Sequence, residues 1–192
     1  MFADFDELYY NLCGIDIQIG ADYAHAGVIV LFVKGDKIVY PMYGAGVIEE
    51  LEQREIDGDS QIFYVMHIPV GNLKIMIAAG NAENLGIRHI YDKDEIIRLI
   101  KSVTHIPVDM PDNWNQRYKS NMEKIKSGQL NEVALVYRNL LLRERERGLS
   151  SAEKKMMTTA KQIIISELIL SHNIEKSGAE DMLADMFSVG VI

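Results

Sequence analysis

Residues 32–78 carry short apolar and aromatic runs that are separated by turn signals. The runs Lys37–Tyr40 and Phe63–Ile68 are rich in the β-branched and aromatic side chains that favour strands. Asp57-Gly58 and Gly71-Asn72 combine residues that tolerate positive φ, so each pair predicts a tight turn. Roughly four or five short strands joined in this way predict a small antiparallel barrel or a strongly bent sheet.

Residues 92–192 change to the helical period, with start and stop signals around each apolar stripe. Ser or Asp followed three residues later by Glu forms a capping box, in which a side-chain oxygen accepts from an orphan amide. The predicted helix starts are Asp92, Asp112 or Asn113, Ser150 and Ser177. The predicted stops include the glycines Gly128 and Gly148. These signals predict an all-helical second half.

The change of period divides the chain into two predicted domains of an α+β protein. Residues 31–88 are expected to form the antiparallel β-barrel, and residues 89–192 the helical domain. Residues 1–30 are acidic, show no clear period and fit neither domain. Two interpretations of residues 1–30 stand side by side: a real added segment, or a gene-calling artefact if Leu31 is encoded by an alternative initiation codon.

The charge of the chain is distributed unevenly along its length. The formal net charge is −8, which alone argues against contact with nucleic acid. Residues 114–161, however, hold 11 Lys and Arg against 5 Glu, so this segment is at +6 and the remainder at −14. Such asymmetry suggests that one half faces an anion. The alternative is that Arg143–Arg147 is the solvated end of a helix.

Neither catalysis nor metal binding has support in the residue pattern. The histidines do not pair at metal-ligand spacing, and the single Cys13 has no activating context. Gly44-Ala45-Gly46 lacks the third glycine of a dinucleotide-binding loop. No apolar run approaches the roughly 20 residues that span a bilayer. We therefore expect a cytoplasmic, non-catalytic protein with no cofactor, metal or membrane partner.

Several motifs, taken in order, resemble proteins of the CarD/CdnL family. Lys34–Glu49, with the sequence KGDKIVYPMYGAGVIE, resembles the start of the RNA-polymerase-interacting domain that this family shares with transcription-repair coupling factors. The resemblance continues through residues 63–66, 71–77, 81–88, 113–119, 126–128 and 146–154. It covers about residues 32–187. The helical half, and the lack of helicase motifs, separate this chain from the coupling factors.

The resemblance implies that the first domain is a Tudor-like barrel that binds the β subunit of RNA polymerase through an exposed strand edge. Unpaired amides and carbonyls on such an edge can recruit a partner strand. The family's polymerase-contacting arginine corresponds to Arg54 in this chain. A second contact position corresponds to Met76, where relatives often carry a basic residue. Ala78 likewise replaces the family's usual proline.

The resemblance further implies that the helical domain meets promoter DNA at the upstream edge of the transcription bubble. The family's tryptophan corresponds to Trp114, whose ring would wedge at an unstacked base step. The predicted phosphate ligands are Arg117, Lys119, Lys154 and Lys155. Gln116 stands where many relatives are basic. Without the resemblance, a lone tryptophan at a helix start more often packs in a core.

Together these expectations describe a monomeric transcription regulator that stabilises the open promoter complex with little sequence specificity. Two alternatives belong to other classes. The helical domain could recruit another protein to the polymerase rather than bind DNA, in which case the steep salt dependence of phosphate contacts would be missing. An uncharacterised enzyme would instead require a ligand-sized pocket with convergent titratable groups.

Overall fold

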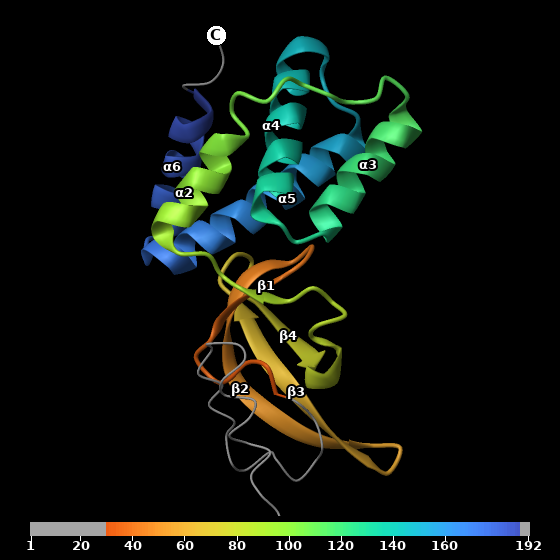
Figure 1. The fold of residues 1–192 in the computed structure, drawn as a ribbon, viewed down its shortest axis with the longest axis vertical. Helices are drawn as coiled ribbons and strands as arrows, with labels where there is room; N and C mark the ends of the chain where they lie inside the picture. Colours follow the sequence, from red (N-terminus) through yellow and green to blue (C-terminus); the bar gives the residue numbers. More distant parts are fainter. Residues whose placement is uncertain (1–29, 189–192) are drawn as a thin grey trace, which may run out of the picture.

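A computed structural model describes residues 30–188, in which a β-sheet is followed by a helical domain (Figure 1). The strands are β1 (Lys37–Tyr40), β2 (Gly44–Ile56), β3 (Asp59–Ile68), β4 (Leu73–Ala78) and β5 (Arg88–His89). All neighbouring strands are antiparallel, in the order β4-β3-β2-β1-β5. The predicted α+β class is therefore confirmed.

Two tight turns connect the central strands as predicted. Asp57 and Gly58 join β2 to β3, with φ angles of 55° and 87°. Positive φ at both positions suits a two-residue hairpin turn whose twist matches that of the flanking strands. Gly71 and Asn72 precede β4, with φ angles of 86° and 50°. In both turns, glycine and its neighbour adopt backbone angles that most side chains disfavour.

The sheet has one irregularity in its register and is not closed, so the predicted barrel is not confirmed. The β2–β3 register shifts between Ile48 and Glu50, and such a bulge bends a sheet locally. Closure would require the two edge strands to pair. β4 and β5 stand at opposite edges of the strand order, and no ladder joins them within residues 30–188. β5 is only two residues long, which leaves little edge to pair.

Five helices make up the second half of the described residues. They are α2 (Lys93–Ser102), α3 (Trp114–Lys126), α4 (Leu130–Arg147), α5 (Ser151–His172) and α6 (Lys176–Ser188), and η2 (Ala79–Asn81) is a short 3-10 turn after the sheet. Asp92 and Asn113 each accept a backbone hydrogen bond at a helix start, and Ser150 forms a complete capping box with Glu153. None of these helices is long and apolar enough to cross a membrane.

The predicted start of the last helix was wrong. Ser177 lies inside the first turn of α6, which begins at Lys176. The amide of Ala179 donates to the carbonyl of Glu175, so the helical bonding begins ahead of the serine. The chain reaches this point through Asn173, whose φ of 54° ends α5 in the left-handed region.

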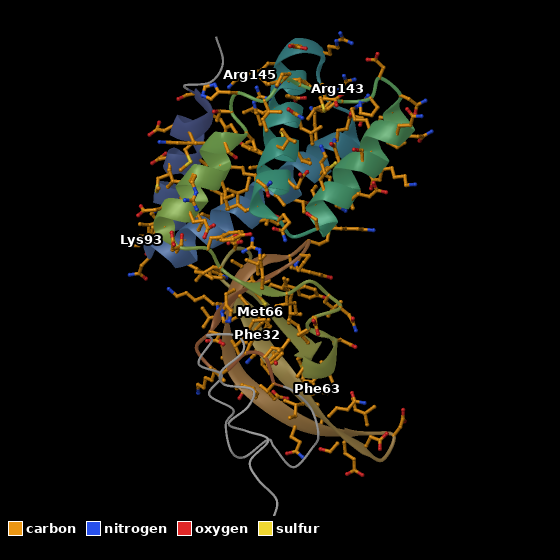
Figure 2. All side chains as sticks on the ribbon, in the orientation of Figure 1. Phe32, Phe63, Met66, Lys93, Arg143 and Arg145 are labelled. Carbon is orange, nitrogen blue, oxygen red and sulfur yellow. The ribbon has the colours of Figure 1, made fainter. Side chains whose placement is uncertain are left out.

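Each half of the molecule has a core of its own. Buried Ile38, Tyr64 and Met66 belong to the core of the sheet, where the amides of Leu31 and Phe32 donate to the Tyr64 hydroxyl. A separate cluster fills the helical domain, from Ile96 and Ile100 on α2 to Leu183 and Phe187 on α6. Figure 2 shows Phe32 and Met66 in the sheet half, with Arg143 at the far end of the helical half. The position of one domain on the other therefore depends on contacts at their junction.

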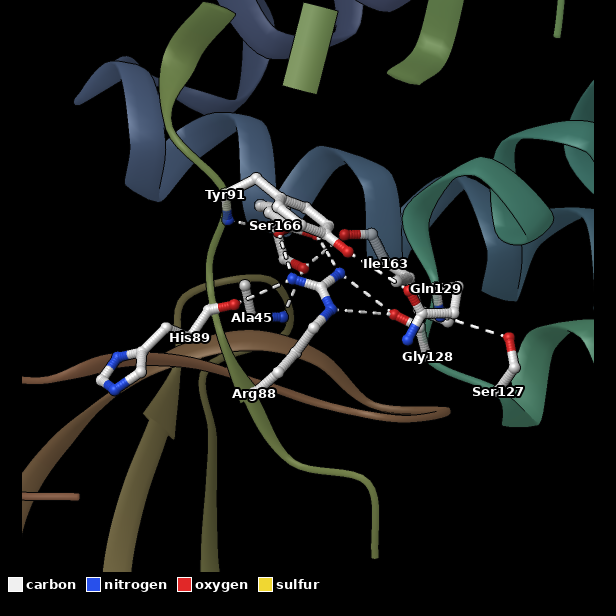
Figure 3. Close-up of polar contacts among 10 residues, drawn as sticks. Ala45, Arg88, His89, Tyr91, Ser127, Gly128, Gln129, Ile163 and Ser166 are labelled. Atoms are coloured by element: carbon white, nitrogen blue, oxygen red, sulfur yellow. Dashed lines mark hydrogen bonds and ion pairs between the residues drawn. The ribbon is translucent and has the colours of Figure 1, made fainter. Parts of the chain in front are cut away.

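Arg88 is the centre of that junction (Figure 3). Its guanidinium donates to both carboxylate oxygens of Glu167 on α5, at 2.7 and 3.0 Å. The same group donates to the carbonyl of Gly128, and it lies 4.1 Å from the centre of the Tyr91 ring. The Glu167 side chain is fully buried. A two-pronged Arg–carboxylate pair of this kind fixes orientation as well as distance.

The β1–β2 hairpin makes a second contact with α5. The Ala45 amide donates to the Ser166 hydroxyl at 2.7 Å, and Lys37 Nζ donates to the Leu170 carbonyl at 2.8 Å. A Cβ at Gly44 would lie 2.5 Å from the Ser166 hydroxyl oxygen. Only glycine therefore allows the turn to approach the helix this closely. The sheet and α5 form one tightly bonded unit.

Candidate nucleic-acid and polymerase interfaces

Trp114 is the first residue of α3, and its side chain is on the surface. It is 44% exposed, so the indole is not sealed inside the helical core. The ring stacks on Tyr118, with centroids 5.5 Å apart and planes at 25°. Its Nε1 donates to the Ser150 hydroxyl at 3.3 Å. The indole is thus both exposed and held in one orientation.

Local sequence accounts for this placement. Asn113 caps α3, so the tryptophan falls at the first helical position. Tyr118 follows four residues later on the same helix face, which brings the two rings together. Ser150 caps α5, so its hydroxyl stands at a second helix start. Trp114 therefore lies where the N-termini of α3 and α5 meet.

Beneath the indole, Glu153 links three elements. Its carboxylate accepts from the Ser150 amide and hydroxyl at 3.0 and 2.7 Å and from Arg117 Nε at 2.8 Å. Arg143 Nε, on α4, lies 3.6 Å from the same carboxylate. Burial raises the pKa of Glu153, but the Ser150 hydrogen bonds and the Arg117 charge outweigh it and hold the pKa below its usual value. The carboxylate is therefore ionised at neutral pH.

The position of Arg117 differs from the prediction that it holds a phosphate. The side chain is only 3% exposed. Its Nη1 donates to the carbonyls of Pro111 and Asp112, and its Nε donates to Glu153. The helical period explains the difference, because Arg117 falls on the inward face of α3 while Trp114 and Tyr118 face outward. In this structure Arg117 supports the tryptophan site from inside and is not free to contact DNA.

The three predicted lysines remain on the surface. Lys119 lies 4.0 Å from Glu123, an exposed pair of the kind that contributes little to stability. Lys154 pairs with Glu144 at 3.3 Å. Lys155 makes no ion pair within residues 30–188. Lys154 and Lys155 are the fourth and fifth residues of α5, and Lys155 lines a cavity together with Tyr118 of α3.

The two predicted polymerase contacts lie on different strands. Arg54 on β2 is exposed, and its Nη2 and Nε donate to Glu52 at 2.6 and 2.9 Å. Met76 on the edge strand β4 is 38% exposed. In the strand register Arg54 is opposite Gln61, whereas Met76 is opposite Val65. The structure does not bring Arg54 and Met76 together at one point.

Sequence reasoning missed two residues of the tryptophan site. Tyr118 could have been found from its i+4 spacing to Trp114. Ser150 was predicted only as a cap, and its bond to the indole depends on tertiary structure. The junction arginine, Arg88, lies in a segment that resembles the family, but its neighbours in the sequence do not indicate its role. Within residues 30–188, no three His, Cys, Asp or Glu side chains gather as metal ligands would.

The fold and the site define an α+β protein, in which an open antiparallel sheet is bonded to helices that display an exposed tryptophan held by stacking and a hydrogen bond. Two known families match successive parts of the chain. Residues 32–91 match the family described as the CarD-like/TRCF RID domain, and residues 98–184 match the CarD C-terminal domain. The chain belongs to the CarD/CdnL family of transcription regulators. It is 38% identical over 138 residues to the Bacillus subtilis (strain 168) protein named "Putative transcription factor YdeB", covering 72% of this chain and 90% of that protein.

Proposed function

We propose that this protein binds the RNA polymerase β subunit through its sheet and promoter DNA at the upstream fork through its helical domain, and thereby stabilises the open promoter complex. The observation that carries the proposal is the exposed, braced indole of Trp114. A flat ring held rigidly on a surface is suited to stacking on an unpaired base. In this proposal the protein acts as a monomer in the cytoplasm.

The free edge of β4 supports the polymerase contact. This strand pairs only with β3, so its other edge carries backbone groups without a strand partner in the described sheet. Leu73 and Met76 are exposed on it. A strand of the β subunit can add to such an edge, with apolar side chains packing alongside.

The surface around Trp114 supports the DNA contact. Lys119, Lys154 and Lys155 extend into solvent near the starts of α3 and α5, where they can neutralise phosphates. A stacked ring and phosphate contacts carry little base information, so we expect weak dependence on DNA sequence. The small basic surface is sufficient because polymerase binding raises the local concentration of the helical domain at the promoter.

The junction couples the proposed polymerase contact of the sheet to the proposed DNA contact of the helical domain. Arg88 and Glu167 hold the sheet against α5, and α5 begins at the cap that orients the indole. Polymerase binding therefore also sets the direction in which the ring points. A rigid connection matters because tighter contact with the melted DNA than with the closed duplex shifts the equilibrium towards the open state.

Measuring open-complex lifetime with Trp114→Ala tests the proposal. Loss of one stacked base is worth about 1–3 kcal/mol. The factor by which the protein lengthens the open-complex lifetime, relative to polymerase alone, should therefore fall by roughly 5- to 150-fold. In a separate pull-down experiment, Arg54→Glu should weaken the capture of polymerase β. A lifetime unchanged by Trp114→Ala, with polymerase binding retained, would rule out the wedge.

A further inference from the structure

A cavity lies between α3 and α5, beside the surface that we propose contacts DNA. Its volume is about 260 Å³. Tyr118 and Met122 line it from α3, Lys155 and Thr159 line it from α5, and Met42 lines it from the β1–β2 turn. We refer to this cavity as the α3–α5 groove. Its size is just below the roughly 300 Å³ at which drug-sized ligand sites begin, so it suits one flat ring system better than a whole cofactor.

The groove is continuous with the tryptophan site. Tyr118 lines the groove and also stacks on Trp114. Ala152, on the opposite wall, is two residues from Ser150, which accepts the indole hydrogen bond. Any strand that meets the indole therefore arrives beside the groove.

The chemistry of the lining favours a base attached to a phosphate. Three methionines, Met42, Met122 and Met156, offer polarisable sulfur atoms that make favourable contacts with aromatic rings. The only charged lining residue is Lys155, which is cationic and makes no ion pair within the described residues. The ligand should accordingly combine an apolar flat body with a negative charge.

We propose that the α3–α5 groove receives one unpaired nucleobase of the melted promoter strand, with Lys155 on the adjoining phosphate. The inference rests on the proposed function, since only a melted fork presents an unpaired base next to Trp114. Extruding a base that has already lost its partner costs little, whereas a paired base must first be unstacked. Filling the groove would therefore favour melted over closed DNA.

Two adjacent threonines allow a matched test. Thr159 lines the groove, while Thr158 is exposed and does not. The hydroxyl of each donates to a carbonyl four residues earlier, at 3.0 Å in both cases. Thr159→Met should fill the groove, and Thr158→Met adds the same side chain on the outer face. Ala152→Met, roughly two turns earlier on α5, also adds bulk to the groove and replaces Thr159→Met if that variant does not fold.

The assay is permanganate reactivity of unpaired thymines in open complexes, with templates that move one thymine through the positions next to the upstream fork. Wild type and Thr158→Met should each shield one thymine that polymerase alone leaves reactive. Thr159→Met should restore its reactivity and shorten the open-complex lifetime roughly fivefold, the lower end for loss of one stacked base.

Unchanged shielding and lifetime with Thr159→Met would overturn the proposal. It would also be overturned if Thr159→Met, unlike Thr158→Met, weakened binding to polymerase in the absence of DNA, because the groove would then hold a protein segment. Trp114→Ala distinguishes a failure of the proposed function from a failure of the groove proposal. If Trp114→Ala leaves the open-complex lifetime unchanged, the wedge is refuted. If Trp114→Ala shortens the lifetime but Thr159→Met changes neither the lifetime nor the shielding, only the groove proposal is refuted.

Discussion

Two arginine–glutamate pairs, one beneath Trp114 and one at the domain junction, use similar chemistry to connect different parts of the molecule. Arg117 and Glu153 join three helices inside one domain. Arg88 and Glu167 join two domains. Both glutamates are almost wholly buried, yet only Glu153 has a second arginine close by, at 3.6 Å.

Buried charges such as these position parts of the fold, whereas exposed charges remain accessible to binding partners. Burying an ion pair seldom adds net stability, but removing one partner leaves the other charge stranded in a poorly solvated place. The buried arginines are therefore expected to matter for stability and positioning. Removing one of the exposed lysines near the indole should cost little stability, and under the proposed function these lysines are the groups that meet phosphates.

The junction pair should show the largest effect. Arg88→Ala leaves the fully buried Glu167 carboxylate without its arginine, and we expect a loss of about 3–5 kcal/mol in the free energy of unfolding. Denaturant titration measures this loss. Arg98→Ala is the matched control, because its pair with Glu95 is exposed and should cost less than about 1 kcal/mol. Equal losses for the two variants would contradict the special role of the junction.

Breaking the pair beneath the indole should cost somewhat less. Arg117→Leu should lower the free energy of unfolding by about 3 kcal/mol, the low end for a broken buried pair, because Arg143 remains near Glu153. Under conditions where the variant is still folded, polymerase binding should persist while the open-complex lifetime falls. Lost polymerase binding in a folded Arg117→Leu would show that the arginine acts beyond the helical domain.

The smallest effect on stability is expected from Ser150, which caps α5 next to the indole. Ser150→Ala removes the α5 cap and the acceptor of the indole N–H, at a cost of about 1 kcal/mol. The fluorescence of the sole tryptophan should report a freer ring, and the open-complex lifetime should shorten. Ser151→Ala, one residue along and exposed, should change neither. Unaltered fluorescence in Ser150→Ala would mean that stacking on Tyr118 suffices to hold the indole.

The features that could be predicted from the sequence are those set by neighbours along the chain. Positive-φ turns at Asp57-Gly58 and Gly71-Asn72, and the caps at Asn113 and Ser150, depend on a few adjacent residues, so local chemistry determines them. The predicted start of α6 was wrong because the backbone hydrogen bond from the Ala179 amide to the Glu175 carbonyl begins the helix ahead of Ser177.

The candidate site required more than local chemistry. Trp114 and the exposed lysines were predicted from the resemblance to a known family, whereas the same motif could not indicate that Arg117 faces inward. The direction of a helical side chain follows from which stripe of the helix is covered, and that depends on α4 and α5.

By itself, the sequence determined where the strands turn, where most helices begin, and that a sheet precedes a helical domain, because each of these depends on residues close together in the chain. Tertiary structure alone decided that the sheet stays open, that Arg88 locks it to Glu167, and that Tyr118 and Thr159 enclose a groove beside the indole. These features arise between segments distant in sequence, where packing geometry and the burial of charge, not local propensity, select the arrangement.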